Sequence, residues 1–599
     1  MTRSPEEREA LAPTAALAAT VVDELVRGGI SDLVLAPGSR SAPVVLAAAS
    51  HADLRVHGRI DERSAAYLAL GLARASGRPA AVLCTSGTAV ASLHPAVLEA
   101  DADGVPLVAL TADRPPELRG VGANQTIDQV RLFGRAVRAD AELHSPQAPL
   151  DPTTPARGWR GEVARLLAAA RGGAAPPGPV QLNLGLREPL VPEDPDDAAR
   201  ALPGRADAAP WTAATAGGAP AREVVEAAAG ALDAPRGLII AGAGTVPAHG
   251  LARSLPPELE TPVAALGRRL GWPVLAEPTA GVGTGAAVVP APDAVARAQG
   301  LGRDARPDVV LRLGRAVLTR PLAALADRDD VPQVAVAQGR WHDPPRTATT
   351  LLSADPMRLC EALLERLGPQ GGAAPPEWLA AWVDAGTAAR RALDAALDRQ
   401  TTLGEARLAR DLPALLPRDG VLMLGSSRPI RDVHEYAAPR DDLAVIGNRG
   451  ASGIDGLTST VAGVALGTDR PVTALTGDLS VLHDAPGLVH AGGPRPDAVL
   501  VVVDNDGGGI FAQLPPGGLP EDLRRWFTTP HGADLDGLAA ALGSRCTTVS
   551  EPRELAGAVA AARSRGGLQL VRVPTDREAT AAEHRALRAE AVAAAEATR

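Results

Sequence analysis

GDLSVLHDAPGLVHAGGPRPDAVLVVVDNDGGGIF, residues 477–511, directly follows one strand-like apolar run and contains the whole of the next. The runs 472–476 and 498–503 have the length and composition of buried strands, and Asp478 and Asn505 come shortly after them. Oxygen-bearing side chains at neighbouring strand ends suit a hard cation such as Mg²⁺, which also binds substrate phosphates. The three glycines after Asn505 let the backbone turn and approach an anion closely. Ordinary turns between two buried strands are the alternative explanation.

Short β-rich runs alternate with Ala/Leu-rich helical segments along the whole chain. This alternation predicts parallel α/β sheets, whose ligand sites lie beyond the carboxyl ends of the strands. Further predicted strands are 32–36, 80–84, 107–111, 237–240, 309–313, 422–424 and 568–571. Pro-, Ala- and Gly-rich stretches at 191–221 and 367–376 indicate linkers. We therefore expect three α/β domains with parallel sheets, 1–195, 220–366 and 375–599, the last ending in a charged, solvated helix.

The composition narrows the class of protein. The 599-residue chain has 46% apolar and 22% charged residues, as expected for a soluble globular protein. Cys84, Cys360 and Cys546 are far apart and odd in number, so we expect no disulfide framework or zinc site, and a reducing, cytoplasmic location. We expect no signal peptide and no membrane span, because the apolar runs are short and interrupted by charge. A net charge of −10 gives no support for nucleic-acid binding.

Lysine is absent, so all 60 residues counted as Lys or Arg are arginine. This absence excludes a Walker A lysine, a Schiff base with pyridoxal phosphate and a lysine nucleophile. Whole classes of mechanism are therefore removed, even if the absence reflects only a GC-rich genome.

Two segments of the first predicted domain contain candidate site residues. In LAPGSRSAP, residues 35–43, Ser39 and Arg40 lie at a strand-to-helix turn, where N–H groups and a guanidinium can bind a carboxylate or phosphate. A helix capped by Ser39, with Arg40 on the surface, is the alternative. Glu62 opens an amphipathic helix, where a carboxylate either complements the helix dipole or hydrogen-bonds a heterocycle nitrogen in an apolar cleft.

Further motifs are spread along the chain. They are APGSRSAP (36–43), IDERSA (60–65), TSGTAVA (85–91), TADRPPEL (111–118), GANQTIDQ (122–129), GNRGASGIDGLTST (447–460), TGDLS (476–480) and NDGGGIF (505–511). Together they resemble thiamine diphosphate-dependent enzymes of the acetolactate synthase and pyruvate decarboxylase type, and within them the synthases of menaquinone biosynthesis that join 2-oxoglutarate to isochorismate. The resemblance covers nearly the whole chain and implies a pyrimidine-binding, a central Rossmann-like and a diphosphate-binding domain, in that order.

The resemblance implies thiamine diphosphate as the cofactor, with Mg²⁺ or Mn²⁺ as its metal. The residues implied to contact the cofactor or metal are Glu62, Ser427, Ile454, Asp478, Asn505 and Gly507. The last three would bind the metal, Gly507 through its carbonyl, and Glu62 would hydrogen-bond the aminopyrimidine ring and promote its activating tautomer. Ile454 would impose the V shape of the cofactor, although an ordinary core isoleucine is the alternative.

The resemblance also implies two dianionic substrates, and arginine binds carboxylates in a planar, bidentate way. The residues implied in substrate binding are Ser39, Arg40, Arg114, Asn124, Gln125, Arg320, Arg431, Arg449, Ile510 and Phe511. Of these, Arg40, Gln125 and Arg431 would join Glu62 in catalysis. The implied reaction is decarboxylation of 2-oxoglutarate and 1,4-addition of the resulting succinyl carbanion to isochorismate. The site would lie between the first domain of one subunit and the third domain of another, in a homodimer or homotetramer.

Three other functions fit parts of the sequence. A carboligase with a different, neutral acceptor would need fewer arginines. A non-catalytic subunit would keep the fold, but the presence of Glu62, Asp478 and Asn505 argues against it. A nucleotide-dependent oxidoreductase would use Gly242 and Gly244, although a structural turn also explains a single Gly-x-Gly.

Overall fold

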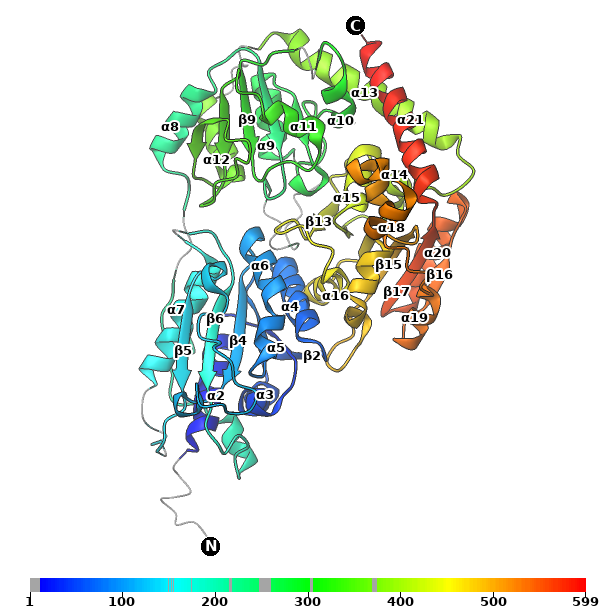
Figure 1. Ribbon diagram of the computed structural model, residues 1–599. Coiled ribbons are helices and arrows are strands. Elements are labelled where there is room, and N and C mark those ends of the chain that lie inside the picture. Colours follow the sequence, from blue (N-terminus) through cyan, green and yellow to red (C-terminus); the bar gives the residue numbers. More distant parts are fainter. Residues whose placement is uncertain are drawn as a thin grey trace.

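Three separate sheets form the framework of the chain, and Figure 1 shows them as three lobes in sequence order. The computed structural model describes residues 11–598, apart from 149, 152, 154–155, 174, 215–217, 247–250, 252–259, 302–304 and 369–373. The N-terminal segment before residue 11, Arg599 and parts of both predicted linkers lie outside the described residues. All pairings between the named strands are parallel. The predicted α/β class with three parallel sheets is confirmed.

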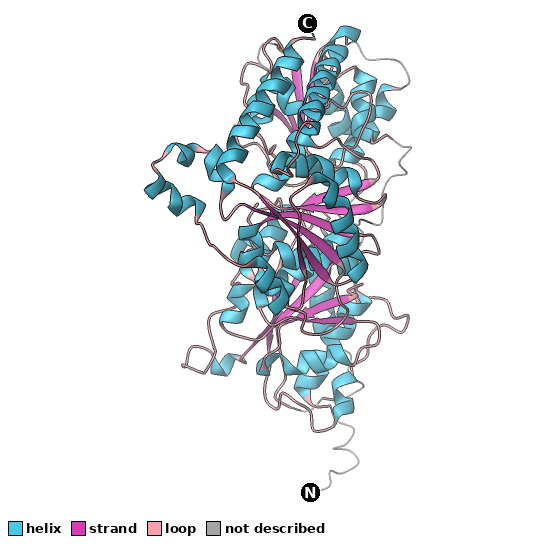
Figure 2. Cartoon of the chain, turned by 90° about the vertical axis from the view of Figure 1, so that its right-hand side faces the viewer, coloured by secondary structure: helices cyan, strands magenta, loops and turns pink. Residues whose placement is uncertain are grey.

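The first sheet has the strand order β2-β1-β3-β4-β6-β5. Its strands are β1 (Asp32–Leu35), β2 (Arg55–Gly58), β3 (Ala80–Cys84), β4 (Leu107–Asp113), β5 (Asp140–His144) and β6 (Val180–Gly185). Its helices are α2 (Pro13–Arg27), α3 (Ala42–Ala49), α4 (Glu62–Ser76), α5 (Thr88–Ser92), α6 (His94–Asp103) and α7 (Arg157–Arg171). Leu33 and Leu83 pack with α2, α3 and α7, whereas Val34 and Val82 pack with α4 and α6 on the opposite face. Helices thus cover both faces, as Figure 2 shows, which explains the continuous apolar runs of these strands.

The second sheet has the order β11-β10-β9-β7-β8. Its strands are β7 (Gly237–Ala241), β8 (Val274–Ala276), β9 (Val309–Leu313), β10 (Gln333–Val336) and β11 (Ala348–Leu352). Its helices are α8 (Arg222–Ala231), α9 (Pro262–Leu270), α10 (Pro292–Arg297), α11 (Arg320–Ala326) and α12 (Pro356–Leu367). A Cβ on Gly242 would clash with the carbonyl oxygen of Arg315, so two turns approach each other closely at this glycine. This contact gives the first glycine of the Gly-x-Gly pattern a packing role.

The third sheet has the order β13-β12-β14-β15-β17-β16. Its strands are β12 (Gly420–Leu424), β13 (Leu443–Gly447), β14 (Val472–Gly477), β15 (Ala498–Asp504), β16 (Cys546–Thr548) and β17 (Leu568–Pro574). The helices around it are α13 (Pro376–Asp398), α14 (Glu405–Leu415), α15 (Arg428–Tyr436), α16 (Leu457–Gly467), α17 (Asp478–His483), α18 (Glu521–Thr528), α19 (Leu535–Ala541), α20 (Pro552–Arg565) and α21 (Arg577–Glu596). Every strand predicted from the sequence overlaps one of the observed strands.

The C-terminal segment forms a helix, α21, but the prediction that it is solvated is wrong for one of its faces. Figure 1 shows α21 beside α13, and its residues Ala581, His584, Leu587 and Ala591 are buried. Their spacing of three or four residues forms a narrow buried stripe, apolar except for His584, along one face of the helix. Among the helices in the described ranges, none is both long and apolar enough to cross a membrane.

The first and third lobes meet through α4 and α16, which lie side by side in Figure 1. Tyr67 on α4 donates a hydrogen bond of 2.5 Å to Asp455 Oδ2, just before α16. Ser64 donates another, of 3.3 Å, to Asp484 Oδ1. These bonds connect the first turns of α4, which begins with Glu62, to the third lobe of the same chain.

Candidate active site

The first group of candidate residues lies at the carboxyl ends of four adjacent strands. Ser39 and Arg40 follow β1, Glu62 follows β2, Ser86 follows β3 and Arg114 follows β4. Because parallel strands point the same way, their carboxyl ends meet at one edge of the sheet. The topology therefore brings these side chains to one edge although they are far apart in the sequence.

Arg40 is buried rather than on the surface, with 8% of the residue exposed. Its Nη1 donates a hydrogen bond of 2.9 Å to the carbonyl of Leu186, and its Nη2 lies 3.5 Å from Glu188 Oε1. Burial and, second, the positive charge of Arg114 lower the pKa of Arg40. Two mutually repelling guanidinium groups in one partly desolvated place favour an anionic ligand.

Arg114 lies against the loop that contains Gln125. Its Nη1 donates hydrogen bonds to Ser86 Oγ and, at 2.9 Å, to the carbonyl of Gln125. Gln125 has a φ of +52°, and its Nε2 donates back to the carbonyl of Ser86 at 2.9 Å. These reciprocal bonds hold the loop against the turn after β3. Gln125, Asn124 and Ser39 are exposed at this edge, where a ligand can reach them.

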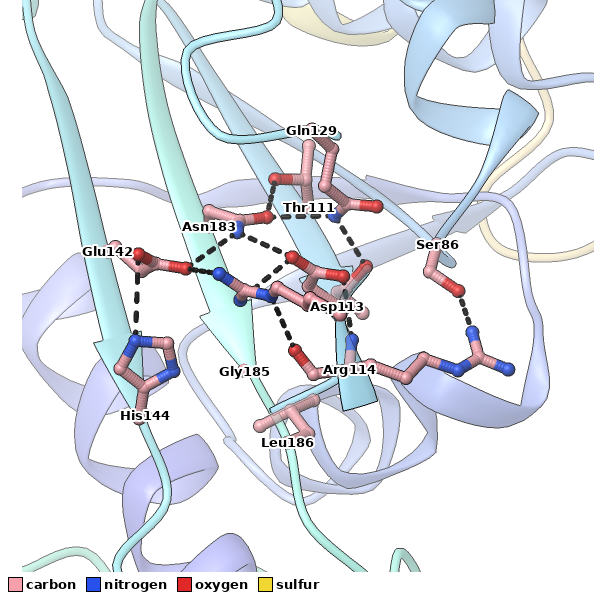
Figure 3. A network of polar contacts seen from close by, with 12 residues as sticks. Ser86, Thr111, Asp113, Arg114, Gln129, Glu142, His144, Asn183, Gly185 and Leu186 are labelled. Carbon is pink, nitrogen blue, oxygen red and sulfur yellow. Dashed lines mark hydrogen bonds and ion pairs between the residues drawn. The ribbon is translucent and has the colours of Figure 1, made fainter. Parts of the chain in front are cut away.

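A buried polar network supports Arg114 (Figure 3). Asp113 is fully buried and accepts hydrogen bonds from the backbone N–H of Arg114 at 2.7 Å and from Asn183 Nδ2 at 2.9 Å. Asn183 Oδ1 accepts from Thr111 Oγ1 at 2.9 Å and from Gln129 Nε2 at 2.8 Å. Burial raises the pKa of Asp113. The network joins β4 to β6 and restricts the backbone from which Arg114 extends.

Glu62 is half-buried at the start of α4. Asp61 caps that helix by accepting a hydrogen bond of 2.7 Å from the backbone N–H of Ser64. The Glu62 carboxylate lies near Cys84, where burial and, second, this negative charge raise the pKa of the thiol. Glu62 therefore lies beside the end of β3, at the same edge as the arginines.

The second group of candidate residues surrounds a cavity of about 180 Å³ at the carboxyl edge of the third sheet. Residues that follow β12, β14 and β15 form much of its wall, for the same topological reason as in the first sheet. The predicted residues that line it are Ser427, Ile454, Asp478, Asn505, Gly507, Ile510 and Phe511. Glu62 is not among the described residues that line this cavity. Within one chain, the cavity therefore does not bring Glu62 together with the second group of candidate residues.

Asp478 and Asn505 supply the oxygen atoms expected of a metal site. Asp478 Oδ2 accepts hydrogen bonds from the backbone N–H groups of Gly507 at 2.8 Å and Asn505 at 3.2 Å, and lies 3.2 Å from His531 Nε2. Burial raises the pKa of Asp478, and these donors oppose the shift. Asn505 Oδ1 is buried and has no hydrogen-bond partner among the described residues. An unpaired buried oxygen close to a carboxylate fits a hard divalent cation.

The glycine run after Asn505 allows a close backbone contact. Gly507 has a φ of +132°, and a Cβ there would clash with the carbonyl of Thr528, to which Gly508 N–H donates a hydrogen bond of 2.7 Å. The Gly507 carbonyl, predicted to be a metal ligand, accepts a hydrogen bond of 3.0 Å from Gly509 N–H. The end of β15 can therefore pack directly against the segment before His531 only because glycines occupy these positions.

Two residues that the sequence analysis missed contact the candidate metal ligands. Ala533 N–H donates a hydrogen bond of 2.9 Å to His531 Nδ1, so the proton is assigned to Nε2, which faces Asp478. Glu405 Oε1 accepts a hydrogen bond of 2.9 Å from Asn505 Nδ2. The turn-rich segment TTPHGAD around His531 was a weak sequence signal. No local pattern could connect Glu405 to a residue 100 positions away.

Arg431 and Arg449 form a second pair of neighbouring cations. Arg431 Nη1 donates a hydrogen bond of 2.5 Å to the carbonyl of Ser427, a residue with a φ of +77°. Burial and, second, the charge of Arg449 lower the pKa of Arg431. Arg449 Nη1 donates to Ser452 Oγ at 2.8 Å, and its buried Nε has no partner among the described residues. The pair thus provides positive charge next to Ser427 in the cavity wall.

Arg320 is the predicted substrate-binding residue that comes from the second lobe. It is the first residue of α11 in the second lobe and is exposed. No hydrogen bond or ion pair within the described part of the chain connects its side chain to another candidate residue. Its role in substrate binding stays a prediction.

Glu405 and Asp432, which line the cavity, lie close enough to His584 to resemble a further metal site. Arg428 already supplies a cation there, because its Nη2 donates to Asp432 Oδ1 and lies 2.9 Å from His584 Nδ1. Burial, despite the opposing charge of Arg428, raises the pKa of Asp432 to about 8. The guanidinium thus takes the position that a metal ion would need.

Known proteins resemble this chain over nearly its whole length. The thiamine pyrophosphate enzyme family matches through its N-terminal TPP binding domain at residues 15–132 and its C-terminal TPP binding domain at residues 433–573. The 2-succinyl-5-enolpyruvyl-6-hydroxy-3-cyclohexene-1-carboxylate synthase of Thermobifida fusca is 44% identical, covering 97% of this chain and 99% of its own. The synthases of that name from Saccharopolyspora erythraea and Chloroflexus aurantiacus are 43% and 41% identical, covering 96% and 95% of this chain and 98% and 95% of theirs. The resemblance found in the sequence is thereby confirmed, and the chain belongs to the 2-succinyl-5-enolpyruvyl-6-hydroxy-3-cyclohexene-1-carboxylate synthase family of thiamine pyrophosphate enzymes.

Proposed function

We propose that this chain transfers a succinyl unit from 2-oxoglutarate to isochorismate, with release of CO₂. The product is 2-succinyl-5-enolpyruvyl-6-hydroxy-3-cyclohexene-1-carboxylate, an intermediate of menaquinone biosynthesis, and the carbon–carbon bond forms by 1,4-addition. The observation that carries the proposal is the buried, unpaired Asn505 Oδ1 near Asp478, in a chain similar to these synthases along its length.

In this proposal Asp478, Asn505 and the carbonyl of Gly507 bind Mg²⁺ or Mn²⁺, the metal of thiamine diphosphate. When bound, thiamine diphosphate supplies the carbon nucleophile that makes decarboxylation of a 2-oxo acid possible. Glu62 holds a proton at the aminopyrimidine ring, and Ile454 and Ser427 contact the cofactor from the cavity wall. The apolar lining of the cavity and the unpaired Asn505 oxygen support these roles.

The arginines are proposed to bind the carboxylates of the two substrates. Arg40 and Arg114 are buried cations at one sheet edge, and desolvation strengthens their attraction for an anion. Arg431 and Arg449 add positive charge near the cavity. The remaining proposed substrate contacts are Ser39, Asn124, Gln125, Arg320, Ile510 and Phe511. Gln125 has the strongest support, since its bonds to Ser86 place it next to Arg114.

We also propose a homodimer or homotetramer in which the Glu62 group of one subunit faces the Asp478 cavity of another. Its support is that, in the described chain, Glu62 does not line that cavity. Residues 1–195 would then bind the pyrimidine and residues 375–599 the diphosphate, with residues 220–366 as the central domain. The three free cysteines agree with a reducing, cytoplasmic location.

The test is an assay with purified protein, thiamine diphosphate, Mg²⁺, 2-oxoglutarate and isochorismate, which follows isochorismate absorbance and product mass. We expect turnover that is lost in Glu62→Gln and kept in Glu162→Gln, a matched change of a partly exposed carboxylate on α7. Release of CO₂ without consumption of isochorismate would contradict the acceptor. A protein that does not bind thiamine diphosphate would contradict the whole proposal.

A further inference from the structure

The side-chain amide of Asn505 can place either its oxygen or its nitrogen toward the cavity, and only the oxygen can bind a metal. The asparagine side chain alone does not determine which of the two orientations is adopted. In the structure Nδ2 points to Glu405 Oε1 at 2.9 Å, while Oδ1 is buried and has no partner among the described residues. The residue that contacts the amide nitrogen therefore determines the orientation of the amide.

Glu405 is suited to select this orientation. It is the first residue of α14, with 2% of the residue exposed, and it lines the same cavity as Asn505. Its Oε1 also accepts a hydrogen bond of 3.1 Å from Thr575 Oγ1, which follows β17. This second bond attaches the Glu405 carboxylate to the third sheet. The position of the oxygen that accepts from Asn505 is therefore fixed by the sheet as well as by α14.

Close packing around the Asn505 amide restricts where the amide group can lie. A Cβ on Gly509 would lie 2.5 Å from Asn505 Nδ2, so a larger residue there would displace the amide. The glycine lies on one side of the amide group and Glu405 accepts from its nitrogen. Rotating the amide by half a turn would bring Oδ1 against the Glu405 carboxylate and leave Nδ2 facing the cavity, which exchanges a hydrogen bond for repulsion between two acceptors.

We propose that Glu405 is a positioning residue that holds the Asn505 amide with its oxygen toward the metal. This inference rests on the proposed metal site and adds the residue that orients one of its ligands. Glu405 acts here as a hydrogen-bond acceptor and not as a ligand, because its Oε1 is already engaged by Asn505 and Thr575. Outer residues of this kind typically change metal affinity by about 10- to 100-fold when they are lost.

The experiment measures Mn²⁺ binding by electron paramagnetic resonance in the presence of thiamine diphosphate, corrected for the Mn²⁺ that thiamine diphosphate binds without protein. Glu405→Met keeps a similar volume but removes the acceptor, whereas Glu405→Gln keeps a carbonyl that can accept from Asn505. Both changes remove the same charge. Thr575→Val is a further control, because it removes a neighbouring hydroxyl and leaves the bond between Glu405 and Asn505.

We expect Glu405→Met to weaken Mn²⁺ binding by about 10-fold or more, and Glu405→Gln and Thr575→Val to stay within about 3-fold of the parent protein. Circular dichroism and the melting temperature without metal would show that the variants fold. If Glu405→Met does not fold, Glu405→Leu tests the same loss. Unchanged Mn²⁺ affinity in a folded Met or Leu variant, or equal losses in the Gln and Met variants, would overturn the inference. A parent protein that binds no Mn²⁺ would instead overturn the proposed metal site.

Discussion

Gly71 on α4 and Gly463 on α16 face each other where the first and third lobes meet. A Cβ built on Gly463 would lie 3.0 Å from the Cα of Gly71 and would clash with the carbonyl oxygen of Leu68. The two helices therefore touch through their backbones, and the start of α4, which includes Glu62, depends on this contact for its place relative to the third lobe.

We expect Gly463→Ala to lower the apparent free energy of unfolding by about 1–3 kcal/mol, because the added methyl group overpacks the contact. The shift of the urea midpoint measures this loss. Gly557→Ala is the matched control, since a Cβ on that glycine of α20 meets no atom within 4 Å and should stabilise the helix by roughly 0.5–1 kcal/mol. Equal urea midpoints for the two variants would mean that α4 and α16 can move apart to accommodate the methyl group without a loss of stability.

Replacement of Arg114 tests the anion site proposed for the first lobe. We expect Arg114→Met to lower kcat/KM by about 10- to 100-fold, mainly through KM, because a charge-assisted hydrogen bond to a substrate carboxylate is lost. Arg131→Met, which changes an arginine that is 77% exposed, is the control. Steady-state kinetics for both acids provide the measurement, and an unchanged KM for each would remove Arg114 from the binding site.

Mixing inactive variants tests whether the site lies between subunits. Glu62→Gln and Asp478→Asn change different lobes, so a heterodimer of the two variants would contain one unaltered site. Random exchange makes half of the dimers mixed, and we expect recovery of about one quarter of the parent activity. Glu62→Gln mixed with Arg114→Met should recover no activity beyond what the Arg114→Met subunits show on their own, because both changes lie in the first lobe. Activity that does not return in the first mixture would place the site within one chain.

Asp484 predicts a pH dependence of stability. It accepts hydrogen bonds from Ser459 N–H at 2.7 Å, Ser459 Oγ at 3.1 Å and Ser64 Oγ at 3.3 Å, yet burial raises its pKa to about 6. An unfolded aspartate titrates near pH 4, so between about pH 4 and 6 the native state holds a proton that the unfolded state has released. Stability therefore falls as pH rises through this window and levels off above it.

We expect this component to reach up to about 3 kcal/mol and to be absent from Asp484→Asn. Because other groups titrate in the same range, the useful quantity is the difference between the parent and the variant in apparent melting temperature from pH 4 to pH 7. A difference that stays constant across these pH values would show that Asp484 is ionised throughout.

Much of the architecture could be predicted because its causes are local. Strands such as β15 are runs of apolar residues buried on both faces, and the sequence shows each run directly. The positions of Asp478, Asn505 and Arg114 after strands were also predictable, since the carboxyl ends of parallel strands share an edge. The buried stripe of α21 was missed because charged residues surround the small alanines that form it.

The sequence by itself determined the α/β class, the strands, the family and the residue types available for metal and carboxylate binding. Only the tertiary structure decided that Arg40 is buried and that Glu405 accepts a hydrogen bond from Asn505, 100 residues away. The physical reason is the distance along the chain over which each interaction acts. Strand formation and turn geometry depend on neighbouring residues, whereas the partner of a buried polar atom is set by packing between segments that are distant in the chain.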